Sequence, residues 1–242
     1  MKFKKNISAL FILLLMLGAS CHSRKEADVN RSPHTTVPQA DILYRQAMAL
    51  MQSAFSPDST IKCIRLLDEA LSIDSLNPDY YGVKAKLLSE MGELDSALYV
   101  QTLAMKKKAI TGEYLLQLGL FQAAKDMDQQ AHDNFGKSRD ILQTVLKHYP
   151  DSLGAFILAE AANALYLNED SVFMKDIDNI RKQFPNRLME IEMTRRLKPH
   201  SLIRQIKSIQ TEKLYSANLD SIAMDAVKKS EREEAARQKN KN

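Results

Sequence analysis

The chain has 242 residues, of which 45% are hydrophobic and 26% are charged. This composition is typical of a folded protein with a buried core and excludes a disordered chain. The formal net charge is +4, but three of the 34 basic residues lie in the first five positions, so the remainder carries 31 basic against 30 acidic residues. A nearly neutral body gives no support for a nucleic-acid partner. Glycine and proline number only seven each and tryptophan is absent, which favours helices.

The N-terminus has the parts of an export signal. A basic start (2–5) precedes an apolar run (7–17), and small residues (18–20) lead to Cys21. This order resembles the bacterial lipoprotein signal, Leu-small-small-Cys, although Leu17 lies one residue further from the cysteine than in that pattern. The resemblance implies that 1–20 is removed and that Cys21 carries a lipid. The alternatives are simple secretion and an uncleaved anchor, for which the run is short, since a span takes about 20 residues.

Residues 21–38 are polar and contain Pro33 and Pro38, so we expect a flexible tether. From 39 onward, apolar residues recur at spacings of three and four, which indicates helices. Asn77-Pro78 predicts a helix start, because asparagine is a good N-cap and proline is tolerated in the first turn. Gly92 predicts the end of that helix, and a partner helix follows from Leu94 to Lys107. The expected unit is therefore helix, short turn, helix.

Side chains of similar size recur every 34 residues. Three rows show this without a gap: Cys63, Ala97 and Ala131; Leu67, Gln101 and Phe135; and Ala70, Ala104 and Ser138. Small residues are expected where two helices cross closely. The period and the unit resemble the tetratricopeptide repeat, and a fourth unit fits at 153–184. Gln101 departs from the pattern, since the family has a large apolar residue there.

The resemblance implies an all-α fold, a right-handed superhelical solenoid of antiparallel helix pairs. We expect this repeat array over 39–186. Residues 187–227 are expected to form C-terminal capping helices that cover the last repeat, and 228–242 is a charged tail.

The sequence contains no residue pattern typical of a catalytic or metal-binding site. The five histidines have no zinc-motif spacing. Asp126 and Asp128 resemble the start of a calcium loop, but Ala131 and Lys137 stand where glycine and glutamate are required. We therefore expect no enzyme activity, no cofactor and no metal. Cys63 is expected to be a small core residue.

A solenoid of this kind has a concave groove that commonly binds peptides or helices. The register gives partner-binding candidates on the first helix of each unit: Met48, Gln52, Lys86, Leu116, Leu120 and Ile157. Toward the C-terminus the groove becomes apolar, which has two interpretations. It receives an apolar segment of a partner, or the chain's own helices after 186 fill it and make these residues core. The second is favoured, because an exposed apolar patch of this size is rare.

The leading functional hypothesis is a lipid-anchored scaffold that mediates protein–protein contacts at the bacterial cell envelope, at the periplasmic face of the outer membrane. A narrower version is envelope assembly, since 149–152 and 184–186 resemble the Tyr/Phe-Pro-Asp/Asn junctions of repeat lipoproteins that act in outer-membrane protein assembly. The alternative is a groove closed by the C-terminal helices, with small-ligand binding or an enzyme-accessory role.

Overall fold

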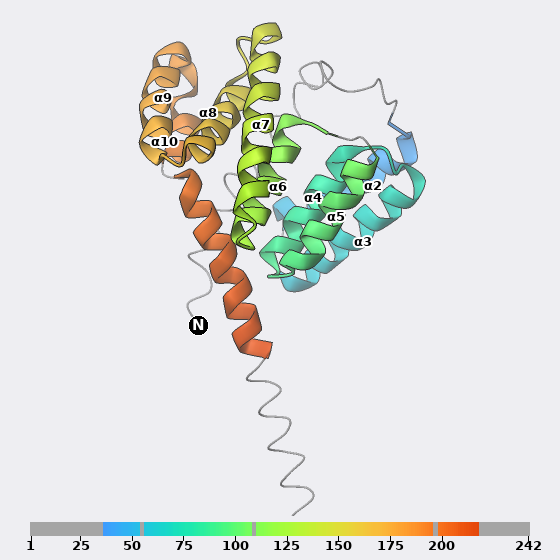
Figure 1. Cartoon of the computed structure of the whole chain (residues 1–242). Coiled ribbons are helices and arrows are strands. Elements are labelled where there is room, and N and C mark those ends of the chain that lie inside the picture. Colours follow the sequence, from blue (N-terminus) through green and yellow to red (C-terminus); the bar gives the residue numbers. More distant parts are fainter. Residues whose placement is uncertain (1–35, 54–55, 108–109, 196–197, 218–242) are drawn as a thin grey trace, which may run out of the picture.

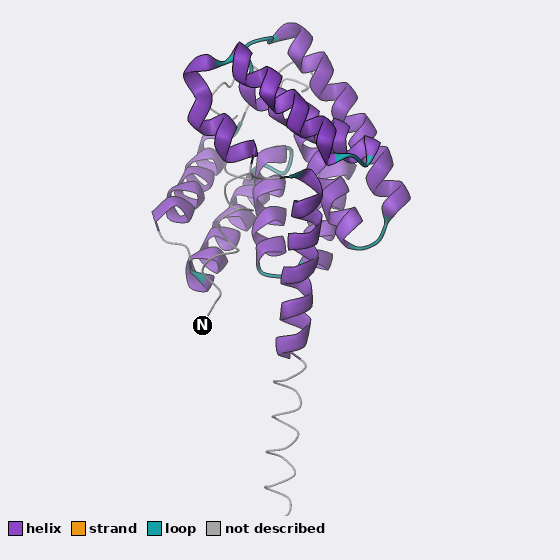
Figure 2. Ribbon diagram, turned by 90° about the vertical axis from the view of Figure 1, so that its left-hand side faces the viewer, coloured by secondary structure: helices purple, strands orange, loops and turns teal. Residues whose placement is uncertain are grey.

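The structure is a computed structural model, and it describes residues 36–53, 56–107, 110–195 and 198–217. Helices connected by short turns make up these ranges, and no strand occurs in them, which confirms the all-α prediction (Figures 1 and 2). The predicted leader, Cys21, almost all of the tether and the charged tail lie outside the described residues.

The helices follow one another as four pairs. The pairs are α2 (Pro38–Ser53) with α3 (Pro57–Ile73), α4 (Pro78–Glu90) with α5 (Leu94–Lys106), α6 (Gly112–Ala124) with α7 (Asp128–His148), and α8 (Leu153–Leu167) with α9 (Asp170–Gln183). The 3₁₀ turn η3 (Pro185–Arg187), α10 (Leu188–Arg195) and a helix at 199–217 follow. The partners in each pair pack together, and consecutive pairs contact each other through α3 and α4, α5 and α6, and α7 and α8.

Local sequence signals set the helix ends. Asn77 is the N-cap of α4, and its side-chain oxygen accepts a hydrogen bond from the backbone N–H of Asp79 at 3.0 Å. Gly92 follows the end of α4 with φ of +74°, a conformation that costs glycine little. Ser56 and Ser59 form a reciprocal capping box at the start of α3. Both helix boundaries predicted around α4 are therefore confirmed.

The rows of small side chains lie where the helices of a pair meet. Cys63, Ala97 and Ala131 are all buried. The Cys63 thiol donates to the carbonyl of Ala47 at 3.4 Å, across the α2–α3 contact. In the next small row, Ser138 donates to the carbonyl of Gly112 at 2.6 Å, across the α6–α7 contact. A larger side chain in either row would push the two helices apart.

Gln101, which breaks the apolar row, is fully buried and takes part in a polar network. Its amide donates to the side-chain oxygen of Gln117, and the Gln117 amide donates to the carbonyl of Gly82 at 3.2 Å. The Tyr114 hydroxyl donates to the Gln101 carbonyl. Because buried polar groups need partners, the glutamine at 101 is matched by the glutamine at 117, and together they link α4, α5 and α6.

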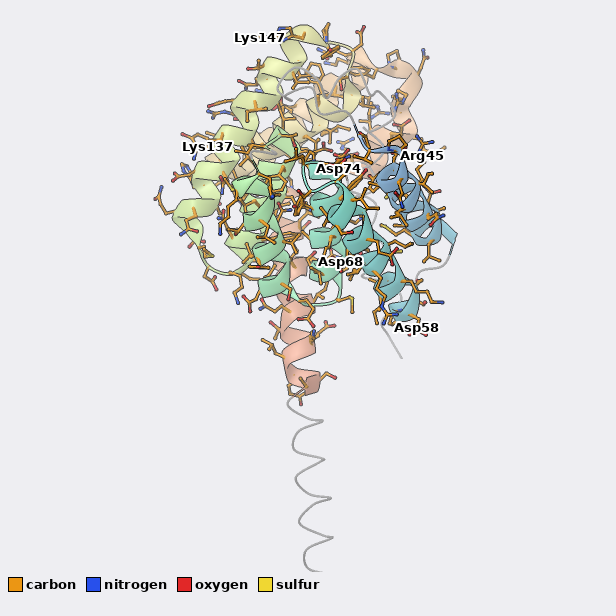
Figure 3. All side chains as sticks on the ribbon, turned by 90° about the vertical axis from the view of Figure 1, so that its right-hand side faces the viewer. Arg45, Asp58, Asp68, Asp74, Lys137 and Lys147 are labelled. Atoms are coloured by element: carbon orange, nitrogen blue, oxygen red, sulfur yellow. The ribbon has the colours of Figure 1, made fainter. Side chains whose placement is uncertain are left out.

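Charged side chains lie on the outer surface of the helix pairs. Figure 3 shows Lys137 and Lys147 on α7 at one side of the molecule and Arg45 on α2 at the other, and all three are exposed. Asp68 of α3 forms an ion pair with Lys84 of α4, and this ion pair links two neighbouring helix pairs. Exposed pairs of this kind stabilise little, and the apolar core holds the pairs together.

Gly119 tests the close approach of α6 and α7. A Cβ at this position would lie 2.5 Å from Cε1 of Phe135, so Gly119→Ala forces the phenylalanine ring to move. We expect a loss of about 1–3 kcal/mol in the free energy of unfolding. Chemical denaturation monitored by circular dichroism measures it.

Gly82→Ala is the matched control, because it is also a glycine-to-alanine change inside a helix. The nearest atom to a Cβ at Gly82 is Oε1 of Gln117, at 3.7 Å. Helix propensity should therefore raise stability by up to about 1 kcal/mol. Equal effects of the two substitutions would contradict the close helix crossing at Gly119.

Candidate functional site

The predicted groove residues occupy different environments. Leu116, Leu120 and Ile157 are 2%, 3% and 3% exposed, and they belong to one hydrophobic core cluster. Met48 is half-buried against a separate cluster formed mainly by α2, α3 and α4, and Gln52 is exposed. The structure therefore brings together the three C-terminal candidates and leaves the two N-terminal ones apart. In this arrangement the three buried side chains are not accessible to a partner.

The cluster that contains Leu116 also contains side chains of helix 199–217. Leu202 and Ile206 of this helix are buried in it, and Ile203 and Ile209 pack against it. These positions follow the three-and-four spacing of one apolar helix face. Helix 199–217 starts near α10 and runs past the N-terminal end of α7, and both views show its far end projecting beyond the other helices (Figures 1 and 2). An amphipathic helix of the chain itself thus lies against the preceding helix pairs.

Three polar contacts, two of them lysine–carboxylate pairs, connect helix 199–217 to three successive helix pairs. His200 Nδ1 lies 2.7 Å from Asp170 at the start of α9. Lys207 pairs with Asp126, in the turn between α6 and α7. Lys213 pairs with Glu93, in the turn between α4 and α5. Each acid comes from the turn region inside a pair, so the helix crosses the pairs along one edge.

Asp170 also supports the start of helix 199–217. Its Oδ1 accepts the backbone N–H of His200 at 3.2 Å in addition to the imidazole contact. The first N–H groups of a helix lack partners within that helix, and a carboxylate satisfies both the hydrogen bond and the helix dipole. Asp170 therefore fixes the N-terminal end of the helix, whereas the Lys207 and Lys213 pairs are more exposed to solvent.

A charged pair is buried near the other end of this crossing. Lys86 and Glu90 lie one turn apart on α4, with side chains 6% and 5% exposed, and Lys86 Nζ is 4.0 Å from Glu90 Oε1. Burial lowers the pKa of Lys86 and raises the pKa of Glu90, and the attraction between the two opposes both shifts. Both carboxylate oxygens of Glu90 lack a hydrogen-bond partner among the described residues. Such an arrangement is costly unless another group supplies donors.

A second carboxylate with an unusual environment is Glu160 on α8. Burial, followed by a hydrogen bond with Asp176 and the negative charge of Asp176 on α9, raises the pKa of Glu160 to about 7. This pair holds a proton between α8 and α9 at mildly acidic pH. We interpret this contact between α8 and α9 as part of the helix packing.

Sequence reasoning missed the three acids that contact helix 199–217. Asp126 attracted attention only as part of an incomplete calcium loop. Within the described ranges, no group of three or more histidine, cysteine, aspartate or glutamate side chains could hold a metal ion. The acids recur in or next to the turn of three successive helix pairs, and basic residues recur at 200, 207 and 213. Matching these two series of charges could have identified the acids from the sequence.

The raised pKa of Glu160 makes stability depend on pH. In the folded protein Glu160 keeps its proton up to about pH 7, whereas a glutamate of the unfolded chain loses it around pH 4.5. Proton binding therefore stabilises the folded protein at pH 4.5, and this stabilisation is lost as the pH rises through about 7. Glu160→Gln should therefore raise the free energy of unfolding at pH 8 by about 1–2 kcal/mol and leave it nearly unchanged at pH 4.5. Urea titrations at the two pH values measure this difference. Glu69→Gln, at an exposed position of α3, is the control, and the same gain at both pH values for Glu160→Gln would contradict the assignment.

None of the helices in the described part of the chain has the length and apolar character needed to cross a membrane. Comparisons with protein-family models, with curated proteins and with solved structures found no match to this chain. The clearest feature of the described residues is an edge formed by three helix pairs, along which helix 199–217 lies through apolar and polar contacts.

Proposed function

We propose that the chain is a lipid-anchored scaffold of the tetratricopeptide type, which holds a partner protein at the bacterial cell envelope. The observation that supports the proposal is helix 199–217, an amphipathic helix that lies along one edge of the helix pairs and contacts it through apolar and charged side chains. Repeat arrays commonly use such extended surfaces to bind helices or peptides. No residue in the proposal is assigned a chemical step.

The arrangement of the helix pairs supports the repeat architecture. Small side chains occupy buried positions at a period of 34 residues, at Cys63, Ala97 and Ala131. First helices of neighbouring pairs also pack together, α4 with α6 and α6 with α8. Stacking of this kind, continued along the chain, generates the right-handed solenoid that the repeat resemblance implies.

The anchor rests on the N-terminal sequence. The basic start, the apolar run and the small residues before Cys21 support export and lipid attachment. A scaffold fixed to a membrane raises the local concentration of its partner at that surface. This is the physical advantage of combining an anchor with a binding surface, and we propose the periplasmic face of the outer membrane as the location.

A second candidate function follows from the burial of Leu116, Leu120 and Ile157. If helix 199–217 is a permanent part of the core, the edge is closed to protein partners, and small-ligand binding or an enzyme-accessory role remains. The two candidates differ in whether the edge ever binds another helix.

Cys21→Ser tests the anchor and the scaffold in one experiment. The tagged wild type and the variant are expressed in a native-like envelope, crosslinked in intact cells and separated into membrane and soluble fractions. We expect the wild type in the membrane fraction with a specific envelope protein attached. The variant should move to the soluble fraction with at least ~10-fold less crosslinked partner, because the effective concentration falls.

Cys63→Ala is the control, since Cys63 is a buried core residue and its loss should leave the membrane fraction unchanged. A Cys21→Ser protein that stays in the membrane fraction would contradict the lipid anchor. A wild type that crosslinks to no envelope protein would contradict the scaffold.

A further inference from the structure

One acidic side chain from each of three successive helix pairs lies along the same edge of the body. We call Glu93, Asp126 and Asp170 the acidic track. Asp170 contacts His200, Asp126 contacts Lys207 and Glu93 contacts Lys213 of helix 199–217. These three positions of the helix are seven and six residues apart. Seven residues of helix rise about 10 Å and make about two turns, so His200 and Lys207 lie on one side, whereas six residues make roughly 1.7 turns and place Lys213 roughly 120° further around the helix. The track therefore recognises a helix with a basic residue at every second turn.

The apolar part of the same pattern is equally regular. Leu202 and Ile206 are buried and Ile209 is partly buried, and they alternate along the helix with the basic positions 200, 207 and 213. An occupant of the track thus needs two features together: an apolar stripe and basic residues about two turns apart along the helix. A helix with both features fits the track, whereas an extended peptide, an acidic helix or a nucleic acid lacks at least one of them.

Helix 199–217 is held unevenly along the track. Its first half has the buried apolar side chains and the Asp170 contacts. Its last turns contain Leu214 and Tyr215, which are 64% and 66% exposed. Lys213 pairs there with Glu93, and both side chains are more than a third exposed. An exposed ion pair stabilises by about 1 kcal/mol or less, so the distal half of the helix can leave the track at low cost.

Near this distal half, the buried carboxylate of Glu90 receives no hydrogen bond from helix 199–217. Ile209 and Lys213 approach Gly92, just beyond the end of α4. Two residues before it, Glu90 is buried with Lys86 Nζ 4.0 Å from its Oε1, and neither carboxylate oxygen has a hydrogen bond among the described residues. A buried carboxylate without donors costs several kcal/mol on the scale of ion desolvation. An occupant that brings a donor to Glu90 would bind this part of the track better than the chain's own helix does.

We propose that the acidic track is the partner-binding surface and that the partner presents an amphipathic helix with basic residues about two turns apart. Helix 199–217 is the internal occupant, and the partner displaces it from the distal end, where Lys213 meets Glu93. This deepens the proposed scaffold function and rests on it. The partner helix also supplies a donor to Glu90, which helix 199–217 does not.

The test uses the full chain and a fluorescently labelled synthetic peptide with the sequence of residues 199–217 as the probe. In the wild type the attached helix competes at an effective concentration of about millimolar, so the peptide binds weakly. Lys207→Glu with Lys213→Glu places like charges against Asp126 and Glu93 and releases the attached helix. We expect this double variant to bind the peptide at least ~10-fold more tightly in fluorescence anisotropy.

The matched control is Lys198→Glu with Arg204→Glu, which makes the same charge change at exposed positions that have no ion pair among the described residues. It should alter the peptide affinity less than about twofold. A peptide with glutamate at positions 207 and 213 should lose binding to the released protein. Added salt should weaken binding of the original peptide.

Equal peptide affinity of the wild type and the released double variant would overturn the proposal. Circular dichroism checks that the body remains folded, and Lys207→Gln with Lys213→Gln is a milder release that keeps the test decisive if the glutamates unfold it. Unfolding of both double variants would also overturn the proposal, because the helix would then be a structural element. Peptide binding is independent of Cys21 and of cells, so its failure is distinguishable from the absence of an envelope partner in the crosslinking experiment.

Discussion

The close crossing of the two helices in the first three pairs is the constraint on which the rest of the structure depends. Side chains no larger than cysteine occupy the crossings at positions 63, 97 and 131, and all three are buried. Because large side chains are excluded there, apolar side chains from neighbouring positions interdigitate around each crossing and form the core. The same constraint repeats at a fixed interval, so consecutive pairs are built alike and can pack side by side.

Repetition of the pair also repeats its turn. A carboxylate in or next to the turn of one pair therefore has counterparts in the next pairs, and Glu93, Asp126 and Asp170 come to lie along one edge. Helix 199–217 contacts all three through His200, Lys207 and Lys213. The edge thus acquires a chemical pattern that no single pair has, and this is why a binding function is inferred from the array as a whole.

Local features of the fold were predictable from the sequence, because they depend on neighbouring residues. Asn77 with Pro78 predicts the start of α4, Gly92 its end, and the 34-residue rows predict the buried small positions. The polar partner of Gln101 was not predictable, since Gln117 lies on another helix and only the packing of α5 against α6 brings the two together. Cys21 and its lipid remain a prediction, because they lie outside the described residues.

The candidate site was predictable only in part, for a physical reason. The period identifies which face of each first helix turns inward, but it contains no information about where a helix after the repeats will pack. Leu116, Leu120 and Ile157 were therefore open to two interpretations, and the structure buries them. In the sequence, the acidic side chains that contact helix 199–217 resemble any other acidic residues, and only the fold places them along one shared edge.

Amide hydrogen exchange along helix 199–217 of the unmodified chain tests most directly whether this helix is a replaceable occupant. The account predicts that amides of 210–217 exchange faster than those of 199–209. It also predicts that raising the salt concentration to about 0.5 M accelerates exchange at 210–217 while α6 and α7 stay protected, because the ion pairs are screened and the apolar core is not. Exchange of all of 199–217 together with α6 and α7, at a rate independent of salt, would contradict it.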